Sequence, residues 1–174
     1  YEDKEYDQVI GQTGGTSFKP VRYSEVQMID AGTSATLWST LTDSSGLYSI
    51  TTTTNTNKSV YIRVLSSSAP ISTPRVNIRN LSSAIYAVRT ANVTLSGNTA
   101  LNLSIPVTNP ADGAFNILDV FTSGFEFVNN YAGASPPELN AFWQQNNQYG
   151  TYFCPLYEST YCRGGEGRYI LSDP

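Results

Sequence analysis

The side chains that most hydrolases use for catalysis are largely missing from this sequence. It contains no histidine, which excludes the Ser-His-Asp and Cys-His arrangements of nucleophilic catalysis. Asp112, Asp119 and Glu126 recur every seven residues, but acids at this spacing on one helix usually form a solvated face rather than the carboxylate pair of a glycosidase. The glycine-rich run at residues 164–167 lacks the lysine and the following helix of a phosphate-binding loop. We therefore expect no catalytic activity, no metal and no cofactor.

The two cysteines offer a different kind of chemistry. Cys154 and Cys162 are eight residues apart, a spacing that a disulfide can close in an oxidising compartment. Without histidine, the pair cannot complete a zinc site of four ligands. A disulfide is the expected state, and two buried thiols are the alternative.

The charge balance of the sequence bears on whether the protein binds nucleic acids or membranes. Only 14% of the residues are charged, the net charge is −4, and only three of the residues are lysines, so there is no basic surface for a phosphate backbone. No apolar run approaches the roughly 20 residues that a membrane-spanning helix needs. We expect neither nucleic-acid binding nor membrane insertion.

The composition also bears on localisation. The chain is rich in Ser, Thr and Asn and starts at Tyr1 rather than Met, which favours a processed, extracellular protein or an excised fragment. Four Asn-x-Ser/Thr sequences permit glycosylation without requiring it, since such matches are frequent in this composition. They begin at Asn57, Asn80, Asn92 and Asn102.

Residues 1–108 have the pattern of a β-sandwich. Apolar residues alternate with polar ones in several short runs, about ten residues apart and separated by turn residues. The clearest cases are Val60, Ile62 and Val64, and then Leu101, Leu103, Ile105 and Val107. The fold class is therefore expected to be mainly β, with a sandwich followed by a helical segment at 109–149 and an extended tail at 150–174.

The helical segment begins where the apolar period changes. Apolar residues now recur at three- and four-residue steps, as on one stripe of a helix, at Leu118, Phe121, Phe125 and Val128. Asp112 is a candidate N-cap, and Gly133 is a candidate for the left-handed residue that ends the helix.

A second, shorter helix is predicted after the first. Ser135 can serve as its N-cap, Pro136 fits the first helical position, and Glu138 stands three residues after the cap. This capping box predicts a helix that continues to Trp143.

The tail carries aromatic surface out of proportion to its length. Most of the aromatic residues of the chain follow residue 114, and two short candidate strands flank the cysteine loop. These strands contain Tyr152 and Phe153, and then Tyr169, Ile170 and Leu171. If the second of these strands lacks a neighbour, its backbone donors and acceptors are left unpaired. The tail is then expected to pack against another chain.

The segment from Gly11 to Ile50 contains the most specific motif. Within "LTDSSGLYSI", Asp43 can accept backbone hydrogen bonds while Gly46 takes a positive φ, which predicts a hairpin turn between two strands. Together with "KPVRYSEVQMID" upstream, the stretch resembles the carboxypeptidase regulatory-like family. That resemblance implies a seven-stranded, transthyretin-like sandwich that is an accessory module of secreted or surface proteins; another immunoglobulin-like sandwich is the alternative.

The last third resembles a different family in the order of its elements. Helices, a cysteine loop, a glycine-rich turn and a strand follow one another as in the lead-in to the zinc helix of secreted metallopeptidases of the thermolysin-like clan. The His-Glu-x-x-His helix itself has no counterpart here, so no ligand or catalytic residue carries over.

These patterns predict a non-catalytic, extracellular structural module that associates with copies of itself. Strand addition is the expected mode, with Val9 and Ile10 as a candidate donor, and an interface that does not close by rotation grows into a filament. The other interpretation of residues 1–10 is a solvated acidic arm before the first strand of the sandwich. Two alternative functions remain: an accessory region of a secreted metallopeptidase, and a carbohydrate- or surface-binding module that stacks sugars on Trp38, Tyr48 or Tyr61.

Overall fold

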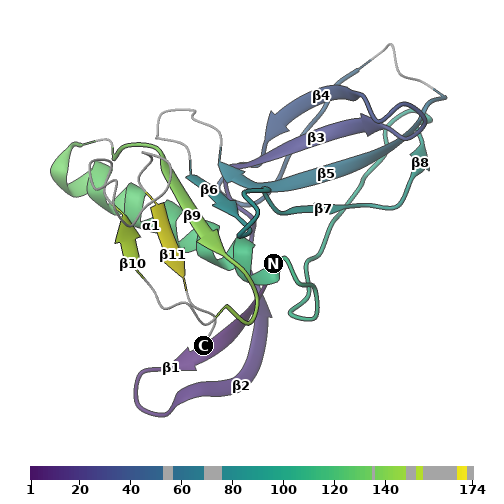
Figure 1. The fold of residues 1–174 in the computed structure, drawn as a ribbon. Helices are drawn as coiled ribbons and strands as arrows, with labels where there is room; N and C mark the ends of the chain where they lie inside the picture. Colours follow the sequence, from purple (N-terminus) through teal and green to yellow (C-terminus); the bar gives the residue numbers. More distant parts are fainter. Residues whose placement is uncertain (53–56, 69–75, 135, 148–151, 155–167, 172–174) are drawn as a thin grey trace. The chain divides into compact units, whose positions relative to one another are not determined.

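The computed structural model confirms a mainly β fold with one helix in the part of the chain that it describes (Figure 1). The described residues are 1–174 except 53–56, 69–75, 135, 148–151, 155–167 and 172–174. They fall into two compact units, one formed by residues 1–65 and 87–112 and the other by residues 66–86 and 113–174. This division differs from the expected segments 1–108, 109–149 and 150–174, because residues 66–86 belong with the C-terminal part of the chain.

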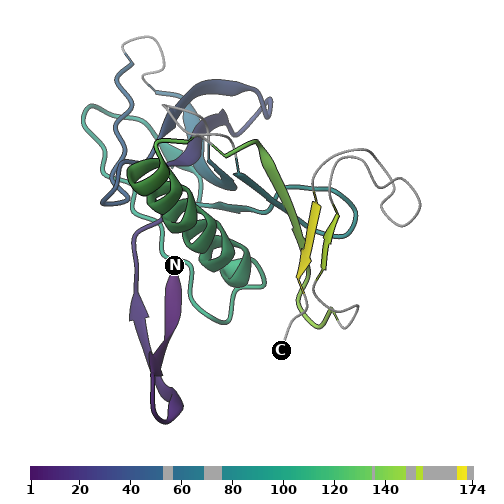
Figure 2. The same ribbon diagram turned by 90° about the vertical axis from the view of Figure 1, so that its left-hand side faces the viewer.

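The first unit begins with a β-hairpin. Strands β1 (Glu2–Asp7) and β2 (Gly11–Phe18) pair antiparallel and form a two-stranded sheet of their own. Figure 2 shows the N-terminus at one end of this hairpin and the turn at the other. The alternative interpretation of an acidic arm that precedes the first strand is therefore wrong, because residues 2–7 themselves form a strand that pairs with β2, although residues 4–7 are exposed.

The main sheet of the first unit is antiparallel. Val26, Met28, Val60, Ile62 and Val64 point to one face of it and are buried, which confirms the alternation seen in the sequence. Its strands are β3 (Ser24–Asp30), β4 (Thr36–Leu41), residues 59–65 of β5 (Ser59–Ser68), β7 (Ala87–Arg89) and β8 (Val93–Thr94).

Two predicted strands of the sandwich do not form in the first unit. Residues 47–50 and 101–107 belong to none of the described strands, although Leu101 and Leu103 are half-buried and Ile105 is buried. The alternation therefore predicted correctly that Leu101, Leu103 and Ile105 turn inward, but Val107 is exposed. The strand pairing that the pattern also implied is not seen for these segments among the described strands.

The second unit contains a mixed sheet. Strand β9 (Leu139–Trp143) pairs in parallel with β6 (Val76–Arg79) on one side and with β11 (Arg168–Leu171) on the other, and β11 pairs antiparallel with β10 (Tyr152–Cys154). The last residues of β5 join β6 through the pair Ser67 and Asn77.

The predicted second helix is wrong, since residues 139–143 are strand β9. All five residues of this strand are buried, as expected for a strand with parallel neighbours on both sides. The Glu138 carboxylate accepts a hydrogen bond from the Asn77 side-chain amide at 2.9 Å. Ser135, the predicted N-cap, lies outside the described residues.

Helix α1 (Asp112–Ala132) confirms the first predicted helix. Ala114, Phe115, Leu118 and Thr122 form its buried side. The helix ends as expected at Gly133, which has a φ of 60° and whose amide donates to the carbonyl of Asn129. The predicted capping role of Asp112 differs, because its carboxylate accepts a hydrogen bond from the amide of Glu2 at 3.2 Å.

Candidate functional site

The base of the β1–β2 hairpin is fixed by a dense set of hydrogen bonds. Tyr1 is buried, its ammonium group donates to the carbonyl of Lys19, and its own carbonyl accepts from the Lys19 amide. The Lys19 ammonium also forms an ion pair with Asp3. The first strand is thus held at its beginning by the residue that follows the second strand.

Glu2 links the hairpin to the chain segment near residue 106. Its amide donates to the carbonyl of Ile105, and its carboxylate accepts from the hydroxyl of Thr16 at 2.6 Å and from the amide of Val107 at 2.9 Å. The bond from Thr16, followed by that from Val107, lowers the pKa of Glu2 below its ordinary value. The carboxylate therefore stays ionised and fixes the hairpin base at neutral pH.

The free end of the hairpin presents two aliphatic side chains to solvent. Val9 is 91% exposed and Ile10 is 73% exposed. The Asp7 carboxylate accepts hydrogen bonds from both of their amides, at 2.8 and 3.0 Å, and Gly11 completes the turn with a φ of 80°. We call residues 8–11 the hairpin tip. The two predicted donor residues are thus held together, side by side, at one end of a closed turn.

Further apolar side chains are exposed along the same hairpin. Tyr6 on β1 is 72% exposed, and Phe18 at the end of β2 is 62% exposed. No charged residue occurs between Gln8 and Phe18, whereas β1 contains four acids and one lysine. The hairpin therefore has an acidic first strand and a neutral, partly apolar second strand and tip.

The tail strands are paired in a way that the sequence did not indicate. Strand β11, which contains Tyr169, Ile170 and Leu171, has β10 on one side and β9 on the other. The expectation that its backbone is left unpaired is wrong, because residues 139–143, predicted as helix, supply the neighbour. Among the described strands, β10, with Tyr152 and Phe153, is the one at the end of this sheet.

The cysteines and the glycosylation sequences remain predictions. Cys154 is the last residue of β10, and Cys162 lies outside the described residues. Asn57, Asn92 and Asn102 are exposed. Asn80 uses its side-chain oxygen to accept hydrogen bonds from the amides of Ser82 and Ala84.

The three candidate stacking rings do not share a face of the sheet. Trp38 is 47% exposed and pairs across the strands with Met28. Tyr61 follows Val60 along β5 and so points to the opposite face, where the guanidinium of Arg89 covers its ring at 4.6 Å. The Tyr48 hydroxyl donates to the carbonyl of Leu101. The arrangement gives little support to a flat sugar-binding platform.

The acids that recur every seven residues, Asp112, Asp119 and Glu126, are all half-buried on α1. Burial raises the pKa of Asp112, while the hydrogen bond from the Glu2 amide opposes that rise. Within the described ranges, no group of three or more cysteine or acidic side chains is placed to hold a metal ion. No helix in this part of the chain is long and apolar enough to cross a membrane.

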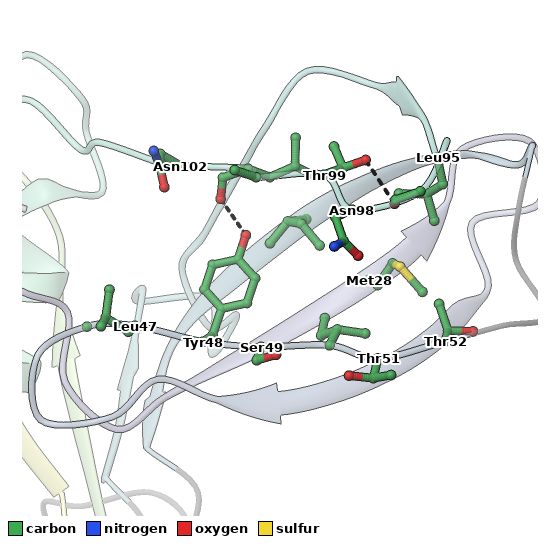
Figure 3. Close-up of a pocket in the computed structure, with 16 residues that line it drawn as sticks. Met28, Leu47, Tyr48, Ser49, Thr51, Thr52, Leu95, Asn98, Thr99 and Asn102 are labelled. Carbon is green, nitrogen blue, oxygen red and sulfur yellow. Dashed lines mark hydrogen bonds between the residues drawn. The ribbon is translucent and has the colours of Figure 1, made fainter.

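A cavity in the first unit was not predicted from the sequence. It has a volume of about 530 Å³ and is bounded by residues 46–52 on one side and by Leu95 and residues 97–102 on the other, with Met28 between them (Figure 3). Ile62 also lines it. None of the residues that line it is charged. The Asp43 carboxylate holds the start of one wall by accepting from the amides of Ser45 and Leu47, and Gly46 adopts a φ of 74° in this turn.

A buried polar ladder crosses the sheet of the second unit. The Ser67 hydroxyl donates to the Asn77 side-chain oxygen at 2.7 Å, and the Asn77 amide donates to the side chains of Glu138 and Asn140. The side-chain oxygen of Asn140 also accepts from Arg79 at 2.8 Å. These groups satisfy one another, so the ladder serves the register of β5, β6 and β9 rather than a ligand.

Comparison with known proteins adds no assignment, because no protein-family model, no curated protein and no solved structure matches this chain. The resemblances to the carboxypeptidase regulatory-like family and to the metallopeptidase lead-in stay predictions.

Proposed function

We propose that this protein is a non-catalytic, extracellular structural module that associates with further copies of itself through strand addition. The observation that carries the proposal is the β1–β2 hairpin, a separate two-stranded sheet on which Tyr6, Val9, Ile10 and Phe18 are all more than half exposed. A two-stranded hairpin is marginally stable in water unless its apolar side chains pack against something. A hairpin that is fixed at its base and exposes apolar side chains at its tip is therefore suited to contact a partner.

Strand edges supply the surface for addition. Both β4 and β10 stand at ends of the strand order among the described strands, and β2 has a described partner on one side alone. Free edges of this kind pair readily with strands from another chain. With 14% charged residues, the surface also opposes close approach of identical copies only weakly.

The proposed contact joins two different surfaces, a hairpin on one copy and an acceptor on the next. Such a heterologous interface produces a ring if the rotation closes and a filament if it does not. We favour the filament, with the C-terminal aromatic strands as a second contact. The hydroxyl-rich, lysine-poor composition supports an extracellular location for the assembly.

The proposal is tested by sedimentation velocity and negative-stain electron microscopy of the purified chain over a range of concentrations. We expect the wild type to form oligomers or filaments, and the double variant Val9→Ser, Ile10→Ser to remain monomeric. Val120→Ser is the matched control, because Val120 is an aliphatic residue of α1 that is 63% exposed and lies outside the hairpin. A wild type that stays monomeric at every concentration contradicts the proposal.

A further inference from the structure

We call the uncharged cavity of the first unit the neutral cavity. Its two walls show the side-chain alternation of β-strands, although neither wall is part of a described strand. From residue 47 to residue 52, exposed residues alternate with half-buried ones, with Tyr48 and Ile50 turned inward. Residues 101–105 alternate in the same way. Both segments therefore present one face to the core, as a strand of a sandwich does, yet neither belongs to a ladder.

Part of the backbone of each wall is available for pairing. Within the described part of the chain, no hydrogen bond engages the backbone amides or carbonyls of Ser49, Ile50 and Thr51 on one wall, or of Asn98 and Ala100 on the other. Donors and acceptors that alternate along an extended chain are matched by another extended chain. This property favours a polypeptide as the occupant of the cavity, rather than a sugar or a lipid.

The distance between the walls also fits an inserted segment. Tyr48 reaches across the gap with its whole side chain, and its hydroxyl donates to the carbonyl of Leu101 at 2.5 Å (Figure 3). Directly paired strands lie only about 4.7–4.9 Å apart, so these walls are too far apart to pair with each other. The volume of about 530 Å³ falls within the range of roughly 300–1,000 Å³ that is typical of binding pockets.

The charge and polarity of the lining restrict the occupant further. The lining is uncharged, and Met28, Ile50 and Ile62 contribute apolar side chains to it. An occupant with a charged side chain loses hydration there without gaining a partner. The occupant must therefore be an uncharged peptide segment with aliphatic side chains.

The hairpin tip of the same protein meets the requirements of charge and of side-chain type. Residues 8–11 carry no charge, and Val9 and Ile10 are among the most exposed aliphatic side chains of the described residues. The turn already orders their backbone through Asp7, which reduces the conformational entropy lost on binding. We infer that the neutral cavity accepts the hairpin tip of a second copy, with Val9 and Ile10 packed against the apolar lining. This inference rests on the proposed self-association and names its two contact surfaces.

The inference is tested with one variant for each surface. Asn98→Lys adds a charge to the lining of the cavity, because the Asn98 side chain, although exposed in the free chain, points into the space between the walls (Figure 3). Ile10→Asp places a charge on the tip. Each variant alone should weaken association at least about tenfold, because a buried, unpaired charge costs more than the roughly 1.4 kcal/mol of a tenfold change. Asn92→Lys, at an exposed site outside the lining, should associate like the wild type.

Mixing the two variants separates a specific contact from general misfolding. Asn98→Lys copies keep an intact tip, and Ile10→Asp copies keep an intact cavity, so an equimolar mixture should restore this contact in one-to-one complexes of the two variants. Sedimentation velocity and native mass spectrometry with one variant isotopically labelled identify these complexes. A mixture that stays monomeric while the wild type associates overturns the inference.

Two other results would show whether the inferred contact or the proposed function is wrong. If Asn98→Lys assembles like the wild type, or if Asn92→Lys blocks assembly as well, the cavity is not the acceptor, although the proposed function stands. If the wild type itself stays monomeric, the proposed function fails and the inference fails with it.

Discussion

Gly113, in the first turn of α1, lies directly against the ring of Trp143 at the end of β9. A Cβ atom added to Gly113 would stand 2.6 Å from two carbons of that ring, which is closer than nonbonded carbons approach. The contact joins the helix to the buried strand of the second unit and requires a residue without a side chain.

Replacing this glycine should therefore destabilise the protein. Alanine normally favours a helix over glycine by about 1 kcal/mol, but Gly113→Ala should lower the free energy of unfolding by about 1–3 kcal/mol through overpacking against Trp143. Gly124→Ala is the matched control, because nothing lies within 4 Å of a Cβ atom there. Urea denaturation should show a loss for Gly113→Ala and a gain for Gly124→Ala, and a gain for both would contradict the assigned contact.

The same part of the chain shows why local sequence signals misled the prediction of β9. Ser135, Pro136 and Glu138 form a plausible capping box, and local signals of this kind ordinarily begin a helix. The five residues that follow are all buried between β6 and β11, whose sequences lie far away in the chain. Pairing with distant strands on both edges of β9 outweighed the local preference, and a single sequence does not display that pairing.

Other elements could be predicted because their signals are local. The apolar stripe of α1 and the alternation of Val60, Ile62 and Val64 each follow from the period of a single element. The positions of Val9 and Ile10 were harder to foresee. A sequence signal for their turn does exist, since Asp7 and Gly11 bracket three residues, but the acidic composition of residues 2–7 pointed to a solvated arm. The neutral cavity depends on two distant segments and had no local signal.

The hydrogen bonds that Asp7 accepts in the hairpin tip should depend on the ionisation of its carboxylate. Its carboxylate accepts the Ile10 and Val9 amides, and these bonds, that from Ile10 first, lower the pKa of Asp7 below the ordinary value of 3.8. Because the pKa is lower in the folded state, the stabilisation of the turn is complete above the ordinary value and is lost as the pH falls through the folded pKa. The amide resonances of Val9 and Ile10 should therefore titrate with an apparent pKa below 3.8.

The titration is best followed by NMR in the Asn98→Lys variant, which keeps the tip unchanged and is expected to be monomeric. Asp7→Asn is the control, since it removes the titrating carboxylate and should abolish the acid-induced shift changes of both amides. An apparent pKa at or above 3.8 would show that the Asp7 hydrogen bonds do not form in solution.

The buried polar ladder of the second unit should make Asn140 sensitive to substitution. Asn140 accepts hydrogen bonds from Asn77 and Arg79, and it is only 7% exposed. Asn140→Ala should lower the free energy of unfolding by about 1–3 kcal/mol, because it leaves polar groups without partners. Asn92→Ala, at an exposed position, should change stability little. Equal unfolding midpoints in urea for the two variants would mean that the ladder contributes nothing to stability.

Tyr48 should make the link between the two walls of the neutral cavity sensitive to alkaline pH. Burial raises the pKa of its hydroxyl above the ordinary value of 10.0, and the neutral hydroxyl donates to the carbonyl of Leu101. Since the folded state holds the proton more tightly, the stabilisation is complete below pH 10 and is lost as the pH rises through the raised pKa. Ionisation should therefore weaken the link between the walls.

Tyr48→Phe isolates this effect, because it removes the hydroxyl and leaves the ring in place. At neutral pH the variant should lose about 0.5–1.5 kcal/mol of unfolding free energy, the usual contribution of one hydrogen bond. Between pH 9 and 11 its stability should fall less steeply than that of the wild type, as followed by thermal unfolding with circular dichroism. Tyr131→Phe is the matched control, because Tyr131 is 81% exposed and lies outside the lining of the cavity. If Tyr48→Phe and the wild type lose stability in parallel over this range, the Tyr48 hydroxyl does not hold the walls together, and the width of the cavity must be set by the Asp43 turn and by the core residues beneath it.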